Sequence, residues 1–256
     1  MLVLSFTIAV AGKGGTGKTT ISSLIVGHLL RKGKTPVFAV DADANVNLNE
    51  QLGVKVDSTI GGMREELKKK IGANEVPAGM SKDMYMEYLL QDTLVESSGF
   101  DLLVMGRPEG PGCYCAANNM LKRYIDILAK NYPYVVIDNE AGMEHLSRRT
   151  TQKIDLLLLV SEPNPIGIMT AARIKDLAKE MEVSVKETGL IINRVNGQAP
   201  ESLIEEAKNY GLEVLGTIPA DDMLIDYVIK HTPLVELPED SPVVRALDTI
   251  LGKFGI

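Results

Sequence analysis

Short apolar stretches recur along the chain at intervals that suit a sheet covered by helices. Each is an uninterrupted run of mostly aliphatic residues rather than an alternation of apolar and polar positions. Such runs are typical of strands buried on both faces of a parallel sheet. They predict strands at residues 7–11, 37–40, 102–105, 135–137, 156–160, 190–192 and 214–218.

The segments between these runs have the spacing of amphipathic helices. Apolar residues recur at every third or fourth position in 21–29, 120–128 and 174–181, so that they share one helical face. Strands that alternate with helices imply right-handed crossovers. We therefore expect an α/β fold with a doubly wound, mostly parallel sheet and helices on both of its faces.

The region from about 61 to 97 interrupts this alternation. Two helical stretches, 64–70 and 84–94, flank a turn-rich segment. We expect an inserted helical region within a single domain that spans residues 1–256.

Two groups of side chains in this inserted region carry potential chemistry. The cationic run is expected on a solvated helix face, and it consists of Lys68, Lys69 and Lys70. The thioethers could hold a soft metal, but packing in the core is the interpretation that we favour for Met80, Met84 and Met86.

The composition is that of an ordinary folded protein and narrows the range of partners. The 256 residues are 45% hydrophobic and 24% charged, unlike disordered or coiled-coil chains. A formal net charge of −7 repels nucleic-acid backbones and anionic lipids, so we expect neither nucleic acid nor membrane as a partner. The two cysteines, one residue apart, exclude a disulfide framework. A reducing compartment, the cytoplasm, is therefore expected.

A phosphate-binding loop follows the first predicted strand and opens the first predicted helix. Residues 12–19, with the sequence GKGGTGKT, fit the motif G-x-x-x-x-G-K-[ST]. The glycines let backbone amides turn inward around phosphate oxygens, and the helix N-terminus adds partial positive charge. Lys18 is expected between the β- and γ-phosphates of ATP, and the Thr19 hydroxyl on Mg²⁺.

The lysine directly after the first glycine of this loop adds to the motif. With it, the loop resembles the deviant Walker A loop of the P-loop ATPase family that contains MinD, ParA, nitrogenase iron protein and the nickel-insertion ATPases. The resemblance implies a homodimer in which Lys13 reaches the partner's nucleotide, as an arginine finger does in trans. A solvated loop lysine is the alternative. Nucleotide contacts are implied for Gly12, Lys13, Gly14, Gly15, Thr16, Gly17, Lys18, Thr19 and Thr20.

Acidic residues follow two of the predicted strands. Asp43 is the candidate for activating the attacking water, with Asp41 supporting it, although a helix cap is an alternative role for both. The run that ends in Asp138 has a Walker B pattern, and Gly142 resembles the glycine of the family's second switch. The candidate Mg²⁺ ligands, partly through water, are Thr19, Asp43 and Asp138, and the candidate catalytic residues are Asp43, Lys13 and Lys18.

Two later strand ends resemble the family's adenine site. Asn193 and Arg194 end one predicted strand, and an asparagine offers both the donor and the acceptor that a purine edge needs. The loop Pro219, Ala220 and Asp221 follows the last predicted strand, at the carboxyl edge where α/β proteins bind ligands.

A pair of cysteines follows the third predicted strand. In an extended segment, Cys113 and Cys115 would point the same way, about 6.6 Å apart, so that they could share one metal. A tetrahedral site for a soft metal needs four donors, and a homodimer with its two-fold axis near this loop would supply them. Two unrelated buried thiols and a strained local disulfide are the alternatives.

The cysteine pair, together with residues 138–148, closely resembles the CooC-type and AcsF-type ATPases. These proteins help to load nickel into carbon monoxide dehydrogenase or acetyl-CoA synthase. The resemblance runs from the phosphate loop to Asp221. It implies that Ni²⁺ or Zn²⁺ binds Cys113 and Cys115 across a homodimer, and that a nickel enzyme is the client.

The function that we expect is an ATP-dependent metallochaperone that hydrolyses ATP with Mg²⁺. The alternatives are a positioning or partition ATPase of the MinD or ParA kind without metal, and a reductase with an interfacial iron–sulfur cluster. The last apolar helical pattern, 241–256, contains only two cations, Arg245 and Lys253. We therefore expect it to dock on the domain and not to lie on a membrane.

Overall fold

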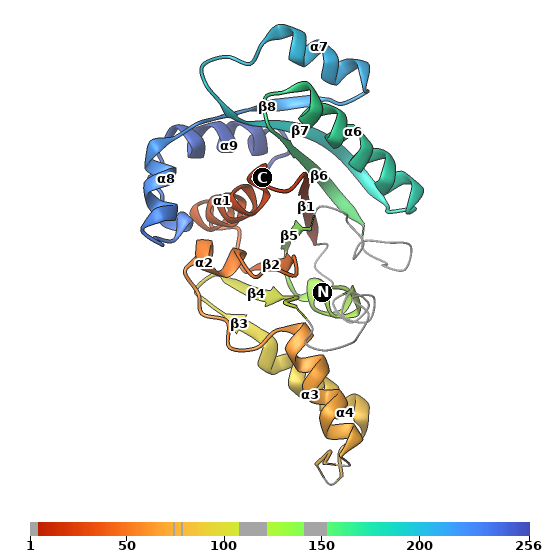
Figure 1. The fold of residues 1–256 in the computed structure, drawn as a ribbon. Coiled ribbons are helices and arrows are strands. Elements are labelled where there is room, and N and C mark those ends of the chain that lie inside the picture. Colours follow the sequence, from red (N-terminus) through yellow and green to blue (C-terminus); the bar gives the residue numbers. More distant parts are fainter. Residues whose placement is uncertain (1–4, 74, 78, 108–121, 141–152) are drawn as a thin grey trace.

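A mostly parallel sheet forms the centre of the molecule (Figure 1). The computed structural model describes residues 5–73, 75–77, 79–107, 122–140 and 153–256. In this part of the chain the sheet has eight strands in the order β3-β4-β2-β5-β1-β6-β7-β8, and only β3 pairs antiparallel. The strands are β1 (Phe6–Gly12), β2 (Val37–Ala42), β3 (Leu94–Glu96), β4 (Phe100–Val104), β5 (Tyr134–Asn139), β6 (Ile154–Ser161), β7 (Val185–Val195) and β8 (Val214–Pro219).

The central strands bury both of their faces. Along β1, Ile8 and Val10 belong to one apolar core, and Ala9 and Ala11 belong to the other. Because successive side chains of a strand point to opposite faces, burial of both faces requires an uninterrupted apolar run. The predicted fold class, a doubly wound sheet with helices on both faces, is therefore confirmed.

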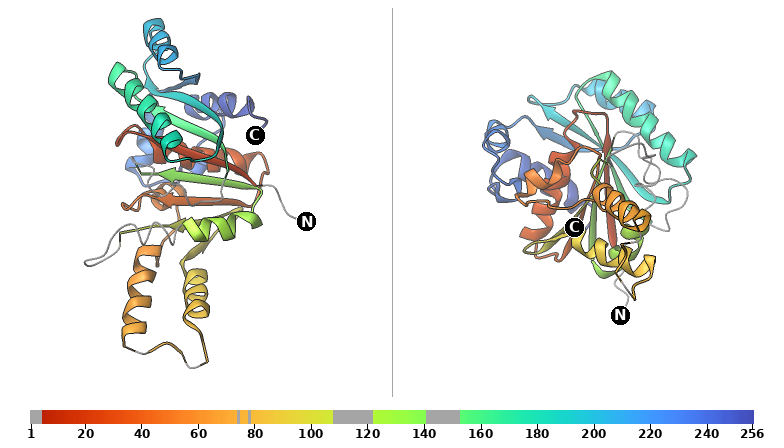
Figure 2. Two further views of the ribbon diagram at one scale, coloured as in Figure 1. Left: turned by 90° about the vertical axis from the view of Figure 1, so that its right-hand side faces the viewer. Right: turned by 60° about the horizontal axis from the view of Figure 1, so that its bottom comes forward.

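Helices cover each core (Figures 1 and 2). One core contains buried residues of α1 (Lys18–Arg31), α2 (Leu48–Leu52), η3 (Leu234–Glu236) and α9 (Pro242–Gly252). The other contains residues of α6 (Pro165–Glu180), α7 (Glu201–Asn209) and helical residues 122–128. The remaining elements near these layers are η1 (Ala129–Asn131) and α8 (Asp222–Ile229).

The inserted region forms an arm of two helices, α3 (Ile60–Gly72) and α4 (Lys82–Thr93), which projects from the sheet (Figure 2). The helical expectation for the stretch that ends at Leu94 needs one correction. Leu94 begins β3, which pairs antiparallel with β4 at the edge of the sheet. A strand of three residues has no periodicity of its own, and only the neighbouring β4 defines it.

The C-terminal helix α9 docks as predicted. Val243, Val244, Leu247, Ile250 and Leu251 are buried, and they belong to the same core as α1. Within the part of the chain that the structure describes, no helix combines the length and the apolar character that crossing a membrane requires.

Candidate nucleotide site

The glycine loop joins β1 to α1 at the carboxyl edge of the sheet. Gly17 has φ +91°, a left-handed conformation that glycine adopts without strain, and a Cβ there would lie 2.5 Å from Asn193 Nδ2. The helix begins at the next residue, Lys18. Among the described residues, no side chain caps its first turn. The amides of that turn are therefore available to an anion, and the helix dipole favours negative charge there.

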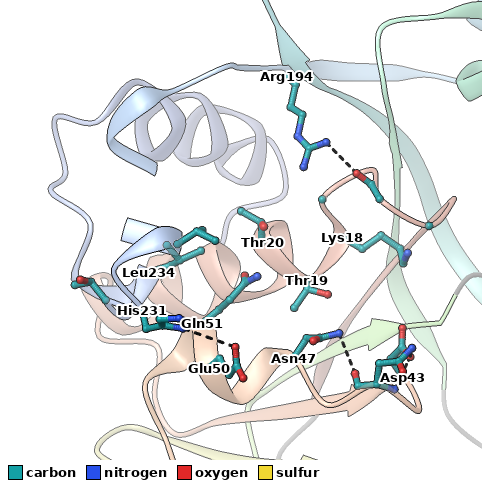
Figure 3. A pocket seen from close by; sticks show the side chains of 16 residues that line it. Lys18, Thr19, Thr20, Asp43, Asn47, Glu50, Gln51, Arg194, His231 and Leu234 are labelled. Atoms are coloured by element: carbon teal, nitrogen blue, oxygen red, sulfur yellow. Dashed lines mark hydrogen bonds and ion pairs between the residues drawn. The ribbon is translucent and has the colours of Figure 1, made fainter. Parts of the chain in front are cut away.

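A cavity of about 480 Å³ opens at this loop (Figure 3). The side chains of Lys18, Thr19 and Thr20 line it, and Asp43 lies across from them on the loop after β2. Lys18 is almost fully buried, and its Nζ donates to the carbonyl oxygen of Lys13 at 3.2 Å. The loop thus holds this ammonium at the cavity wall, where it can meet a phosphate.

Two buried carboxylates lie side by side beneath the cavity. Asp41 and Asp138 are register partners in β2 and β5, and each is 1% exposed. Burial raises the pKa of Asp138 from 3.8 to about 7. The hydroxyls of Thr19 and Ser22 oppose this rise, and the charge of Asp41 adds to it. Ser22 donates its Oγ–H to Asp138 Oδ1 at 3.1 Å.

Ser22 was not identified from the sequence as a residue of this site. It lies four positions after Lys18, one turn along α1, so it faces the same side of the helix as the phosphate-loop lysine. That spacing is the feature of the sequence that could have identified Ser22. The partner, Asp138, is 116 residues away and becomes visible only in the folded sheet.

Asp41 organises the loop that carries Asp43. Its carboxylate accepts the backbone N–H groups of Asp43 at 3.1 Å, Asn47 at 3.1 Å and Leu48 at 3.0 Å. Burial raises the pKa of Asp41 to about 6, although these amides oppose the rise. Since Leu48 begins α2, the helix-cap role considered for this acid pair holds for Asp41. Asp43 lines the cavity and is left facing the space where a phosphate would lie.

The end of β7 clamps the glycine loop from the other side. Asn193 Nδ2 donates to the carbonyl oxygen of Thr16 at 2.8 Å. Arg194 donates to the carbonyl oxygen of Gly15 at 3.0 Å (Figure 3). Arg194 adopts φ +57°, a conformation that costs a non-glycine residue about 1 kcal/mol or more. Both residues therefore hold the loop, and both also line the second cavity described next.

A second cavity, of about 350 Å³, continues the first and shares Gly17, Thr20 and Arg194 with it. Asn193 and α8 form its other walls, together with Pro219, Ala220 and Asp221. The carboxylate of Asp221 caps α8 by accepting the N–H of Met223 at 2.9 Å, and it also accepts the Ser241 hydroxyl. The predicted base-binding residues thus lie together at one pocket.

Lys13 lies outside the phosphate cavity of its own chain. Its exposed side chain borders a separate hollow of about 410 Å³ on the other side of the loop, lined also by Glu162, Asn164 and Ile166. Lys13 is therefore exposed at the surface beside the glycine loop.

The oxygen donors at this edge fit Mg²⁺. Hard cations of this size prefer carboxylate, hydroxyl and water oxygens, and the Asp138 carboxylate already receives the hydroxyl of Thr19. A divalent ion would offset the cost of keeping this buried carboxylate charged.

Three predicted site residues, Cys113, Cys115 and Gly142, lie outside the described residues. Within the described ranges, no group of three or more His, Cys, Asp or Glu side chains is arranged to hold a metal.

Comparisons with known proteins agree with this geometry. The chain is 46% identical over 246 residues to an uncharacterized ATP-binding protein of Methanocaldococcus jannaschii, covering 96% of this chain and 97% of the relative. It is 31% identical to the carbon monoxide dehydrogenase accessory protein CooC of Rhodospirillum rubrum, covering 85% and 84%. The septum site-determining protein MinD of Pyrococcus horikoshii, solved with Mg-ADP, superposes with a TM-score of 0.67 at 21% identity, covering 98% and 96%.

Residues 7–234 match the family model described as the CobQ/CobB/MinD/ParA nucleotide binding domain. The glycine loop, the paired acids and the second cavity all fall within this range. The chain is a member of the CobQ/CobB/MinD/ParA family of nucleotide-binding proteins.

Proposed function

We propose that this protein is an ATP-dependent metallochaperone that hydrolyses ATP as a homodimer and supports nickel insertion into a carbon monoxide dehydrogenase or an acetyl-CoA synthase. The observation that carries the proposal is the pair Cys113 and Cys115 in a chain 31% identical to an accessory protein of carbon monoxide dehydrogenase. Thiolates are soft ligands that suit Ni²⁺ and Zn²⁺, and two chains would supply four of them.

The position of β4 supports a link between nucleotide and metal. The cysteines follow this strand in sequence, and the strand runs parallel to β2 at the nucleotide edge. Met105 donates its N–H to the carbonyl oxygen of Asp41 at 2.8 Å, and the Asp41 carboxylate holds the loop of Asp43. A shift of that loop on loss of the γ-phosphate would therefore act directly on the residues that lead to the cysteines.

The proposed hydrolysis assigns a role to each residue of the site. Loop amides and Lys18 bind the phosphates, and Asp43 accepts a proton from the attacking water. Lys13 of one copy stabilises the negative charge that develops on the nucleotide of the other. Thr19, with Asp43 and Asp138 acting partly through water, would hold Mg²⁺, which neutralises phosphate charge.

The base pocket completes the assignment. Asn193, Arg194 and the 219–221 loop surround adenine, and the clamp on Thr16 and Gly15 links base binding to the conformation of the phosphate loop. ATP then drives the cycle because it favours one arrangement of the dimer over the other.

The test is equilibrium binding of Ni²⁺ and Zn²⁺ by the full chain, with Cys113→Ser/Cys115→Ser as the comparison. We expect one metal per two chains, lost in the double variant, while ATP binding persists. Metal binding that is unchanged in the variant would refute the shared cysteine site.

A positioning or partition ATPase without metal is the second candidate. The fold that the chain shares with MinD favours it, since MinD is a septum site-determining protein and was solved with Mg-ADP. The same experiment separates the two candidates, because this alternative predicts nucleotide binding without stoichiometric Ni²⁺ or Zn²⁺.

A further inference from the structure

The arm formed by α3 and α4 presents apolar side chains that the fold does not bury. Met80, Met84 and Tyr88 are 37%, 54% and 57% exposed. Core packing, which we expected for Met80 and Met84, is therefore wrong; only Met86 packs against the core. The reason is that α4 buries its other face, through Tyr85 and Leu89, and that the described residues leave Met84 and Tyr88 exposed.

The exposed residues form one line along the arm. Met84 and Tyr88 are one helical turn apart on α4, and Met80 precedes the helix at the tip. The ring of Tyr88 stacks on that of the buried Tyr85, with 6.3 Å between centroids. An exposed tyrosine held in one orientation loses little entropy when a partner covers it, which is a property of binding hot spots.

The exposed charges that follow Met84 on α4 and β3 are acidic. Glu87 and Asp92 are exposed on α4, and Glu96 is exposed on the edge strand β3. Between residues 84 and 106 the sequence contains four acidic residues and no lysine or arginine. The outer surface of α3, in contrast, mixes Glu66 with Lys68 and Lys69. The α4 face therefore suits a partner that is apolar at its centre and basic around it, and it repels anionic lipid.

The arm is attached to both ends of the segment that contains the cysteines. At one end, the N–H of Gly61 donates to the carbonyl oxygen of Met105 at 2.8 Å, and Thr59 packs so closely on Gly106 that a Cβ would lie 2.5 Å from its Oγ1. On the other side of that segment, Tyr124 belongs to the same apolar core as Tyr85 and Leu89 of α4. The arm therefore contacts described residues that come before and after the segment in the chain.

We propose that the outer face of α4, with Met80, is the surface on which the client protein docks, through a segment that carries apolar side chains flanked by lysine or arginine. This proposal rests on the proposed function, since it identifies the docking surface of that client. The contacts at Met105, Gly106 and Tyr124 connect the arm to the chain on either side of the cysteine segment.

The experiment measures binding of the full chain to the nickel-free carbon monoxide dehydrogenase or acetyl-CoA synthase of the same organism. The apolar variant is Met84→Ser/Tyr88→Ser, and its matched control is Tyr210→Ser, another exposed tyrosine at the end of α7. The charge variant is Glu87→Lys/Asp92→Lys, and its control is Lys68→Glu/Lys69→Glu on the neighbouring helix. Hydrogen exchange with and without client locates the contact.

We expect the two α4 variants to bind the client at least tenfold more weakly, the controls to bind as the wild type does, and amides of α4 to gain protection. ATP hydrolysis and Ni²⁺ stoichiometry should stay unchanged. Equal client binding by the α4 variants would overturn the docking proposal and leave the proposed function standing. Loss of dimerisation in these variants would identify a subunit interface and also overturn it. Failure of the wild type to bind either client would refute the client assignment itself, and this proposal with it.

Discussion

At the scale of single residues, the central feature is a pair of carboxylates that the fold buries next to a phosphate loop. Asp138 receives the hydroxyls of both Thr19 and Ser22. If Thr19 turns to Mg²⁺, Ser22 remains as the hydroxyl that orients Asp138. We therefore assign Ser22 a positioning role.

Replacing Ser22 by alanine tests that role. A hydrogen bond to a charged group contributes about 1.5–3 kcal/mol, so we expect the Mg²⁺ concentration for half-maximal ATP hydrolysis to rise roughly tenfold or more, with a smaller change in kcat. Ser23→Ala is the matched control, since Ser23 is equally buried on α1 but donates to Gln51. An equal Mg²⁺ requirement in the two variants would remove Ser22 from this role.

The raised pKa of Asp138 makes a prediction about pH and stability. Between about pH 4 and 7, Asp138 is protonated in the folded protein but ionised in the unfolded chain. The contribution of Asp138 to the free energy of unfolding therefore falls as pH rises through this range. In nucleotide-free protein, Asp138→Asn should be more stable than the wild type at pH 8. The expected difference in the free energy of unfolding is a few kcal/mol, because each unit of pKa shift corresponds to about 1.4 kcal/mol. Urea unfolding at several pH values measures this difference. It should shrink as pH falls below 7, and a pH-independent difference would contradict the assignment.

At the scale of elements, the sequence pattern predicts the interior of the sheet better than its edges. The apolar run at 190–192 marks only the centre of β7, which extends from Val185 to Val195. Its first residues are partly exposed and polar, so hydrophobicity does not reveal them. The strand β3 was not predicted either, because it is defined by its pairing with β4 and not by a pattern in its own three residues.

The candidate site likewise has one part that the sequence motif predicts and another that only the folded sheet reveals. The phosphate loop is local in sequence, and its motif predicts it completely. The clamp from Asn193 to Thr16 joins residues 177 positions apart, and it exists because β1, β6 and β7 are neighbours in the sheet. No single segment of the sequence determines the order of the strands, so the contact between Asn193 and Thr16 could not be inferred from the motif.

A buried histidine joins α1 to α9. His28 is 1% exposed, and its Nδ1 lies 2.7 Å from Asp248 Oδ1. Asp248→Ala would leave this nitrogen without a partner, at a cost of about 1–3 kcal/mol. Thr249→Ala, the adjacent exposed position of α9, should change the unfolding free energy by less than about 0.5 kcal/mol. Urea denaturation compares the two, and equal stabilities would show that the pair contributes nothing.

At the scale of the whole molecule, three parts of the chain are connected: the nucleotide cavity, the segment with the cysteines and the arm. The loops after β1 and β2 line the nucleotide cavity, the cysteines follow β4 in sequence, and the arm contacts Met105 directly after that strand. Lys13 lines a hollow that is separate from this cavity, and in the proposed dimer it reaches the partner copy. The central claim is that ATP, by closing this dimer, sets the affinity for the metal.

Equilibrium dialysis of Ni²⁺ against the Asp43→Ala protein, in ATP and in ADP, tests this claim most directly, because the variant should bind ATP without hydrolysing it. The account predicts one Ni²⁺ per two chains and at least tenfold tighter binding in ATP, a coupling of about 1.4 kcal/mol. Adding Lys13→Ala should reduce that difference. The same Ni²⁺ affinity in ATP and in ADP would contradict the account.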